Sequence, residues 1–133
     1  MKILVTGGSG QLAKCLENQS KLSTFTYHSF PKNIFDITDI GSCIEIIEKI
    51  KPDIIINTAA YTKVDQAEKE PDKAYQVNRD AIENLIQGCL QNNVKIIHIS
   101  TDFVFNGNSN SPYKTHDETD PLSVYGKSKL AGE

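Results

Sequence analysis

A short apolar run that passes directly into a glycine cluster restricts the fold of this chain more than any other feature. Residues 2–6 (KILVT) are apolar with a β-branched bias, and three glycines follow at once: Gly7, Gly8 and Gly10. Such a run predicts a buried strand that ends in a tight turn. Apolar residues then recur at helical spacing, so we expect a helix over residues 11–19 to begin at the turn.

Strands and helices are expected to alternate along the rest of the chain. Runs with strand character occupy residues 24–29, 33–36, 53–58 and 94–100. Helical patterns occupy residues 40–50 (with Asp39 as N-cap), residues 72–92, and a last stretch that begins near Leu122. The continuous apolar runs indicate strands that are buried on both faces, which is typical of a parallel sheet with helices on each side. The expected class is therefore α/β, a doubly wound parallel sheet of the Rossmann type.

Composition excludes several classes of function. The chain has 133 residues, enough for one domain, and a formal net charge of -3, which argues against nucleic-acid or anionic-membrane partners. No apolar run approaches the ~20 residues of a membrane span, and the N-terminus is too weakly apolar for a signal peptide. A cytoplasmic protein is expected.

The cysteines and histidines do not suggest a metal site. Three cysteines lie far apart, each within an apolar helical pattern, and are expected to be buried, reduced thiols: Cys15, Cys43 and Cys89. The three histidines share no spacing, and His98, inside an apolar run, is expected to be a hydrogen-bonded core residue. We therefore expect no metal.

The glycine cluster has the chemistry of a dinucleotide site. Its spacing is G-x-x-G-x-x-A over Gly7, Gly10 and Ala13, between an expected strand and an expected helix. Glycines let the backbone approach a pyrophosphate, and the helix N-terminus supplies free N–H groups. A plain strand-to-helix turn is the alternative.

The residues after the second strand bear on the choice of cofactor. No acid ends this strand, where NAD enzymes often have one to bind the ribose. Lys32 stands nearby and could bind a 2′-phosphate, and Asp36 is better placed to bind adenine. NADPH or dual use is therefore favoured over strict NADH.

A tyrosine and a lysine near the end of the chain have the spacing of an acid–base pair. Tyr125 and Lys129 are four residues apart and share a helix face. An ammonium close to a phenol favours the phenolate and so makes a better proton donor. Thr101 follows the strand expected at 94–100, at the sheet edge where ligands bind. Taken alone, Tyr125 would be a packing residue and Lys129 a surface lysine.

Smaller candidates carry weaker signals. Residues 59–62 follow an expected strand and should line the cofactor, although Tyr61 would also serve as core filler. Asp65 and Glu68 fit a helix-capping pattern. Asn78 lies on a helix and is either near the site or a packing polar group.

Five stretches, in order, resemble one known family. They are TGGSGQL, FDITD, NTAAYTKVDQAEKEPDKAYQVN, STDFVF and PLSVYGKSKLAGE. Together they are similar to the extended short-chain dehydrogenases/reductases and, within that family, to reductases of 4-keto sugar nucleotides. The resemblance runs from end to end of the chain. It implies an NAD(P)H-dependent reductase of a 4-keto-6-deoxy sugar nucleotide.

The resemblance also implies site residues. Catalysis would fall to Tyr125, Lys129 and Thr101, and substrate contacts to Thr101 and Asp102. Cofactor contacts would come from Gly7, Gly10, Gln11, Leu12, Asp36, Ile37, Ala59, Ala60, Tyr61, Thr62, Ser100, Tyr125 and Lys129. The cofactor would be NADPH or NADH, with NADPH slightly favoured.

Members of that family are about twice as long as this chain. Residues 1–133 are therefore expected to be the NAD(P)-binding domain, truncated after the Tyr-x-x-x-Lys helix, with the C-terminal substrate-binding part absent. We expect this piece to be inactive alone. An exposed apolar sheet edge would favour self-association, for example as a homodimer.

Two other functions stay open. Proteins that resemble these reductases include non-catalytic NADP-binding regulatory subunits, and sugar-nucleotide epimerases share the Thr/Tyr/Lys set. The related dehydratases have a glutamate where this chain has Phe103, which cannot transfer a proton, so dehydration is disfavoured. Ala13 stands where close relatives commonly have glycine, a mild departure.

Overall fold

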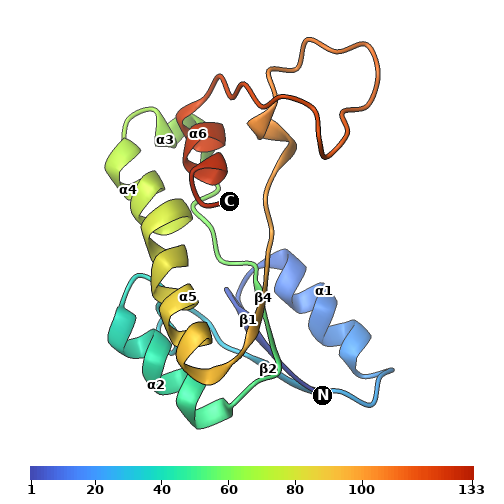
Figure 1. The fold of residues 1–133 in the computed structure, drawn as a ribbon, viewed down its shortest axis with the longest axis vertical. Helices are drawn as coiled ribbons and strands as arrows, with labels where there is room; N and C mark the ends of the chain where they lie inside the picture. The colour runs from blue at the N-terminus through green and yellow to red at the C-terminus, as the bar shows by residue number, and fades with distance from the viewer.

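The computed structural model describes residues 1–133 as a four-stranded parallel sheet with helices on both faces (Figure 1). The strands are β1 (Lys2–Thr6), β2 (Thr26–Ser29), β3 (Ile54–Asn57) and β4 (Lys95–His98). Their order in the sheet is β2-β1-β3-β4, and every neighbouring pair is parallel. The expected doubly wound α/β class is confirmed.

The order of the strands creates a switch point between β1 and β3. From β1 the chain moves to β2 on one side and then returns to β3 on the other side of β1. Leu4 of β1 lies beside His28 in one direction and Ile55 in the other. In open α/β sheets, ligands bind at such a point, outside the carboxyl ends of the strands.

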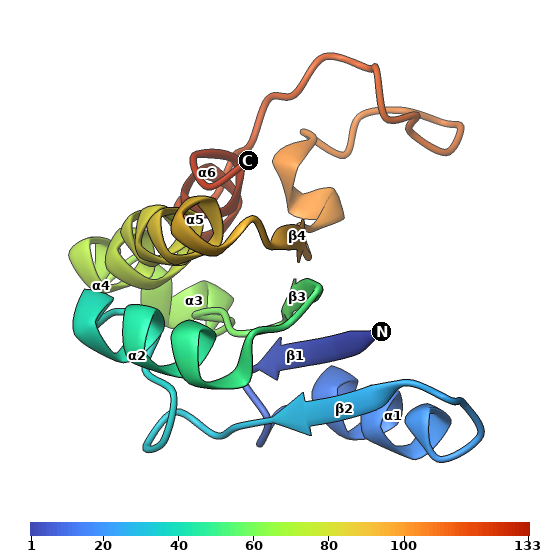
Figure 2. The ribbon, with the colours of Figure 1, turned by 60° about the horizontal axis from the view of Figure 1, so that its bottom comes forward.

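Helices cover the two faces unequally. They are α1 (Gln11–Ser20), α2 (Ile40–Ile50), α3 (Val64–Ala67), α4 (Pro71–Tyr75), the π-helical turn η1 (Gln76–Asp80), α5 (Ala81–Asn92), the 3₁₀ turn η2 (Asp102–Val104) and α6 (Val124–Leu130). Figure 2 shows α1 alone on one face of the sheet, with α2 and α5 on the other. The helix expected over residues 72–92 is thus one helical stretch interrupted by a π turn.

The main core lies between the sheet and the α2/α5 layer. Its buried members are Leu4, Phe35, Ile37, Cys43, Ile47, Ile55, Ala81, Leu85 and Cys89. Gly88 allows the two helices to approach closely, because a Cβ there would lie 2.6 Å from Cδ1 of Ile47. A larger residue at that position would have to displace the Ile47 side chain in the core.

The expectation of a strand at residues 33–36 is wrong. These residues form turns, and Phe35 is buried in the core instead of extending the sheet. The backbone N–H of Asp36 donates to Ser42 Oγ at 3.2 Å, and its Oδ1 accepts from the Thr38 N–H at 3.0 Å. This Asx turn removes the backbone groups that a ladder would need.

The expectation of buried thiols is confirmed for Cys43 and Cys89 and wrong for Cys15, which is exposed. Burial, together with the charge of Asp39, raises the pKa of Cys43 to about 12, and burial raises that of Cys89 to about 11. Cys15 is exposed because α1 lies alone on its face and buries only Ala13 completely.

One capping expectation is confirmed and one is wrong. Asp39 caps α2, its Oδ1 accepting from the Gly41 N–H at 2.8 Å. Asp65 caps nothing, because α3 begins after Lys63 without a side-chain cap. Glu68 instead accepts from the N–H of Val124 at 2.8 Å, and so binds the first turn of α6 from a distant part of the chain.

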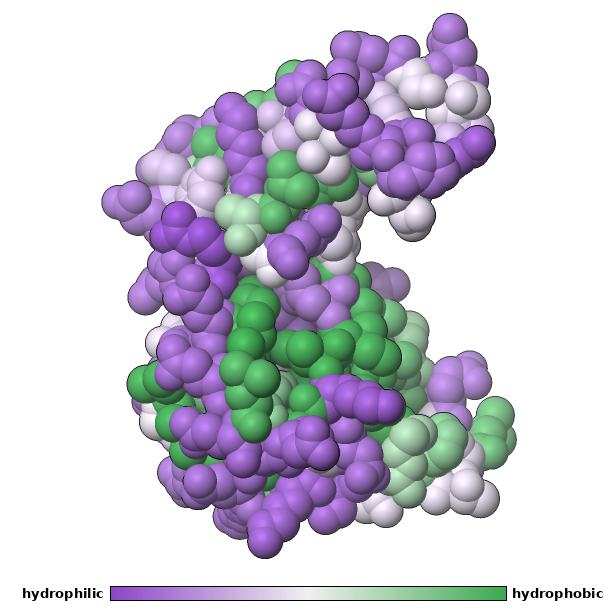
Figure 3. All heavy atoms as spheres, viewed as in Figure 1, coloured by the Kyte–Doolittle hydropathy of each residue, from purple (hydrophilic) through white to green (hydrophobic).

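Strand β4 forms one edge of the sheet and leaves apolar surface exposed. Ile97 within it is 49% exposed. Figure 3 shows hydrophobic surface gathered over the part of the molecule where Figure 1 places β4 and α5, and a hollow below the segment that follows η2. Self-association through this edge stays a prediction.

None of the helices has the length and apolar character that crossing a membrane requires.

Two leucines of α5 test the position of the core. Leu85 is fully buried, whereas Leu90 is 78% exposed. We expect Leu85→Ala to lower the free energy of unfolding by about 2–5 kcal/mol, because it leaves a cavity. The control Leu90→Ala should change it by no more than about 0.5 kcal/mol. Urea denaturation followed by circular dichroism measures both, and equal losses would contradict this placement of α5.

Candidate functional site

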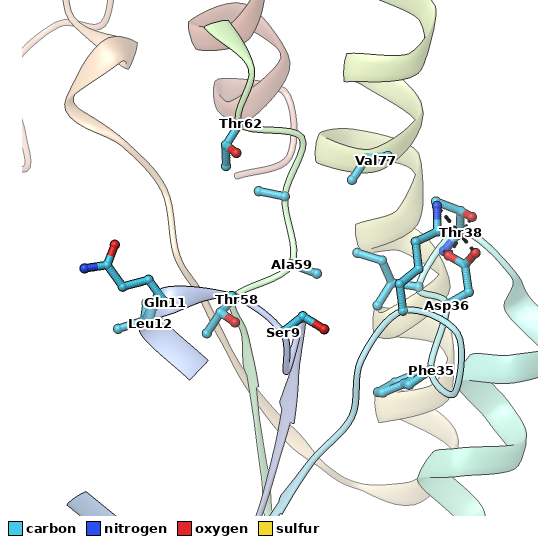
Figure 4. A pocket seen from close by; sticks show the side chains of 15 residues that line it. Ser9, Gln11, Leu12, Phe35, Asp36, Thr38, Thr58, Ala59, Thr62 and Val77 are labelled. Atoms are coloured by element: carbon cyan, nitrogen blue, oxygen red, sulfur yellow. Dashed lines mark hydrogen bonds and ion pairs between the residues drawn. The ribbon is translucent and has the colours of Figure 1, made fainter. Parts of the chain in front are cut away.

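A cavity of about 520 Å³ opens at the carboxyl ends of β1 and β3, at the switch point (Figure 4). It is lined by Gly7, Ser9, Gly10, Gln11, Leu12, Lys32, Phe35, Asp36, Ile37, Thr38, Thr58, Ala59, Ala60, Thr62 and Val77. Figure 4 shows the side chains of Gln11 and Leu12 on one side and those of Asp36 and Thr38 on the other, with Ala59 between them. The cavity is thus lined by the glycine loop and the start of α1, by residues 32–38, by residues 58–62 and by Val77 of the π turn.

The glycine loop forms the floor of the cavity by close backbone contact. Gly7 has φ +65°, and a Cβ there would lie 2.9 Å from the N and Cα of Ala59. Gly10 is the N-cap of α1, and no side chain caps this helix. The first turn of α1 therefore keeps N–H groups available for an anion, beside backbone that no side chain shields.

A carboxylate and an ammonium lie at one end of the cavity. Oδ1 of Asp36 accepts from the hydroxyl of Thr38 at 2.8 Å, and its Oδ2 lies 3.7 Å from Nζ of Lys32. Burial raises the pKa of Asp36, but the hydrogen bonds from Thr38 and the charge of Lys32 outweigh it and lower that pKa below its usual value. Asp36 is consequently an acceptor at neutral pH, while the Lys32 side chain, 73% exposed, is free to meet a ligand.

Asn78 fixes the segment that follows β3. It is 1% exposed, and its amide accepts from the N–H of Tyr61 at 2.8 Å and donates to the carbonyl of Tyr61 at 3.1 Å. The same Nδ2 donates to Ser128 Oγ at 2.9 Å, which joins this segment to α6. Asn78 is presented by the π turn η1, a distortion that often occurs at functional sites. Asn78 is therefore more than a packing polar group.

The Tyr61 side chain does not line the cavity. Its hydroxyl donates to Oε2 of Glu70 at 2.8 Å, and Lys73 lies over its ring. The backbone of Tyr61 is held at the site by Asn78, whereas its phenol belongs to the surface next to α4. The alternative of a core filler is wrong, because the residue is partly exposed, whereas contact of its backbone with a cofactor stays a prediction.

Phe103 contacts both Thr101 and Tyr125, the latter on helix α6. Thr101 Oγ1 accepts from the N–H of Phe103 at 3.2 Å, and the Tyr125 ring packs edge-on against Phe103, with centroids 5.6 Å apart. Gly126 lies so close to the carbonyl oxygen of Phe103 that a side chain would not fit. Ser123 caps the helix by accepting from the Gly126 N–H at 3.0 Å.

Lys129 is buried rather than solvated. It is 2% exposed, and Nζ donates to the carbonyl oxygen of Ile99 at 2.5 Å and lies 3.3 Å from Nε2 of His98. Burial lowers the pKa of Lys129 to about 8, although the nearby Glu133 carboxylate works in the opposite direction. The ammonium nitrogen thus contacts the end of β4 and forms no hydrogen bond with Tyr125.

Most of the residues expected to contact a cofactor line this one cavity. They are Gly7, Gly10, Gln11, Leu12, Asp36, Ile37, Ala59, Ala60 and Thr62. Those outside it are Tyr61, Ser100, Tyr125 and Lys129. Ser100 binds the carboxylate of Glu133 instead, and Asp102 accepts from the hydroxyl of Thr101 at 3.2 Å.

Sequence reasoning missed several lining residues. They are Ser9, Phe35, Thr38, Thr58 and Val77. Ser9 and Thr58 could have been found, because one lies inside the glycine cluster and the other ends an expected strand. Val77 comes from the π turn, which no pattern in the sequence signalled.

Comparison with known proteins gives a consistent result. The family described as RmlD substrate binding domain matches residues 1–133. The chain is 42% identical over 133 residues to the dTDP-4-dehydrorhamnose reductase of Sinorhizobium fredii. It is also similar to two solved dTDP-4-dehydrorhamnose reductases: that of Bacillus anthracis in complex with NADP (39% identity, TM-score 0.94) and that of Clostridium acetobutylicum (37% identity, TM-score 0.95).

The chain spans about half the length of these relatives. The matches cover 100%, 98% and 99% of this chain, but 45% of the Sinorhizobium protein and 47% of each solved chain. The similarity therefore covers nearly all of this chain but only the corresponding half of each relative.

Two glycines with positive φ test the close contact under the cavity. Gly7 (φ +65°) faces the Ala59 backbone, whereas Gly107 (φ +76°) has open space around it. Gly107→Ala should cost about 1–2 kcal/mol of stability from backbone strain alone. Gly7→Ala should cost clearly more, because strain and collision add. Thermal unfolding compares the two, and equal losses would mean that the loop is not pressed against Ala59.

Proposed function

The chain belongs to the RmlD substrate binding domain family, and from this membership we propose that it forms the cofactor-binding part of an NAD(P)H-dependent reductase of a 4-keto-6-deoxy sugar nucleotide. The observation that carries the proposal is the cavity at the β1/β3 switch point, with its glycine loop and uncapped helix end. The Bacillus anthracis relative was solved in complex with NADP, which supports a nicotinamide dinucleotide as the ligand.

The residues present fit a nicotinamide dinucleotide. A pyrophosphate would lie against Gly7 and the first turn of α1, where the absence of side chains allows close approach. Asp36 and Ile37 would hold the adenosine end, with Lys32 available to a 2′-phosphate. Residues 59–62 would border the nicotinamide half. NADPH is favoured over NADH on the basis of Lys32.

The reduction needs a hydride and a proton, and this chain would supply the proton. The bound cofactor provides the hydride. Tyr125 would donate its phenolic proton to the carbonyl oxygen, while Thr101 and Asp102 would contact the substrate. Lys129 would support Tyr125 and the nicotinamide ribose. The Tyr125 carbonyl accepts from Ser128 Oγ at 2.8 Å, but the Tyr125 hydroxyl forms no hydrogen bond within the chain and is available to a substrate.

The substrate that we propose is dTDP-4-dehydrorhamnose, reduced to dTDP-rhamnose in nucleotide-sugar biosynthesis. The names of the relatives support it over the epimerase and over the non-catalytic regulatory subunit. An intact Thr101, Tyr125 and Lys129 would not be needed in a regulatory subunit. Membership of the short-chain dehydrogenase/reductase family and a cytoplasmic location belong to the same proposal.

Lys32 provides a test of cofactor preference. If its ammonium meets the 2′-phosphate, Lys32→Ala should weaken NADPH binding about tenfold and leave NADH binding almost unchanged. Lys49→Ala, an exposed lysine of α2 outside the cavity, is the control. Fluorescence titration of the chain with each cofactor gives both affinities. An equal loss for NADPH and NADH would contradict the assignment of Lys32.

Tyr125 provides a test of the chemistry, in a protein that contains this chain and turns over the sugar nucleotide. Tyr125→Phe removes the proton donor but keeps the ring that packs on Phe103. Turnover should fall by about 10²–10⁴, with little change in cofactor affinity. Steady-state oxidation of NADPH at 340 nm measures the effect. Turnover close to that of the unaltered protein would exclude Tyr125 as the acid.

A further inference from the structure

Glu68 binds the first turn of the helix that carries Tyr125. Its Oε1 accepts from the backbone N–H of Val124, the residue before Tyr125, at 2.8 Å. Val124 is the first residue of α6, and the first N–H groups of a helix have no partner within the helix itself. Glu68 supplies this partner from 56 residues away in the sequence.

Apart from the helix's own N-cap, no other side chain from outside α6 forms a hydrogen bond with this turn. Ser123 caps the helix by accepting from the Gly126 N–H at 3.0 Å, but both residues belong to the same turn. The cap therefore fixes the shape of the turn and not its place in the molecule. Further along, Ser128 accepts from Asn78 at 2.9 Å. The helix thus has one anchor in its second half and one, Glu68, at its start.

The place of Glu68 in the chain ties the start of α6 to the cofactor side of the site. Glu68 is the C-cap of α3, the short helix that closely follows residues 59–62, which we propose to border the nicotinamide half. Ala67, next to it, is fully buried, so packing fixes the end of α3. Helix α3 contacts α6 directly (Figure 1). The carboxylate therefore sets where α6 begins relative to this segment.

The Tyr125 side chain has no hydrogen bond of its own to orient it. Its ring packs edge-on against Phe103, with centroids 5.6 Å apart, and Phe103 is itself 46% exposed. The position of the phenol consequently follows the position of the backbone that carries it. That backbone is held, one residue earlier, by the bond from Val124 to Glu68.

We propose that Glu68 is a positioning residue for Tyr125: its hydrogen bond to the Val124 N–H holds the start of α6 where the phenol can reach a substrate carbonyl beside the cofactor. Glu68 does not line the cavity, so it acts through Tyr125 and not on the cofactor. A displacement of about 1 Å can cost about 100-fold in rate, so an anchor next to the proton donor matters for turnover. The inference deepens the proposed function, on which the role of Tyr125 rests.

NMR spectra of the chain test the proposal without turnover. Glu68→Ala removes the acceptor, and Glu68→Gln keeps an acceptor oxygen without the charge. Asp65→Ala, which removes another exposed carboxylate of α3, is the control. In Glu68→Ala the Tyr125 ring signals, which the neighbouring Phe103 ring shifts, should move towards those of a free tyrosine. The Val124 amide should exchange with solvent about tenfold faster. Neither should change in the other two variants.

The same spectra separate positioning from general support of the helix. Glu68 is exposed, so its replacement should leave the core intact. The amide signal of Ser128 should stay in place, because Asn78 holds that half of α6. Loss of the Ser128 signal would make Glu68 a general helix-stabilising residue and refute the proposal. An unmoved Tyr125 ring in Glu68→Ala, or an equal displacement in Glu68→Gln, would also overturn it.

Val124→Pro removes the other partner of the same hydrogen bond. Proline has no N–H and is favoured at the first position of a helix, and Ser123 before it already has the extended backbone that proline requires (φ −88°, ψ 155°). Glu68→Ala should therefore displace the Tyr125 ring signals in the unaltered chain and add nothing in the Val124→Pro background. The same displacement in both backgrounds would show that Glu68 acts by another route, against the proposal.

Turnover provides the last test, in a protein that contains this chain and reduces the sugar nucleotide. Glu68→Ala should lower kcat about 10–100-fold with KM and NADPH affinity nearly unchanged, and Glu68→Gln should restore kcat to within about threefold of the unaltered protein. A raised KM with an unchanged kcat would contradict the positioning role. If the protein does not reduce this substrate, the proposed function fails, and the spectra of the chain still decide the role of Glu68.

Discussion

The close approach of Gly7 to Ala59 is the contact on which the rest of the site depends. It is possible only because Gly7 has no side chain and takes a positive φ. The contact brings the end of β1 against the end of β3 at the switch point. It is reinforced below by the Thr6 hydroxyl, which accepts from the Ala59 N–H at 3.2 Å, and by Thr58, which donates to the Thr6 carbonyl at 2.6 Å. The cavity and the uncapped end of α1 both lie at this junction.

Much of the fold could be predicted from the sequence because its signals are local. The apolar runs of β1, β3 and β4 and the glycine cluster identify a parallel sheet and its ligand-binding edge without any knowledge of contacts. The wrong prediction of a strand at residues 33–36 also has a local cause. Phe35 and Ile37 are apolar because their side chains are buried in the core, and the turn that Asp36 forms with Thr38 overrides their strand propensity.

Other features could not be predicted, because they depend on partners far apart in the sequence. The sequence left Asn78 either near the site or a packing polar group, and only its two hydrogen bonds to the backbone of Tyr61 show that it holds the segment after β3. Lys129 has the spacing of a partner for Tyr125, but its burial against His98 depends on how α6 packs on the end of β4. Helical spacing predicted the shared face, but not the burial of Lys129 or the lowered pKa that follows from that burial.

The central claim is that the switch-point cavity is the cofactor site, and amide chemical-shift mapping during titration of the chain with NADPH tests it most directly. The account predicts saturable shifts concentrated at the glycine loop, at residues 35–38 and at residues 58–62. The chain has a second large cavity, about 800 Å³, at the amino ends of the strands, lined by Met1, Pro52, Asn92 and their neighbours. Shifts confined to that end, or no saturable shifts at millimolar NADPH, would contradict the account.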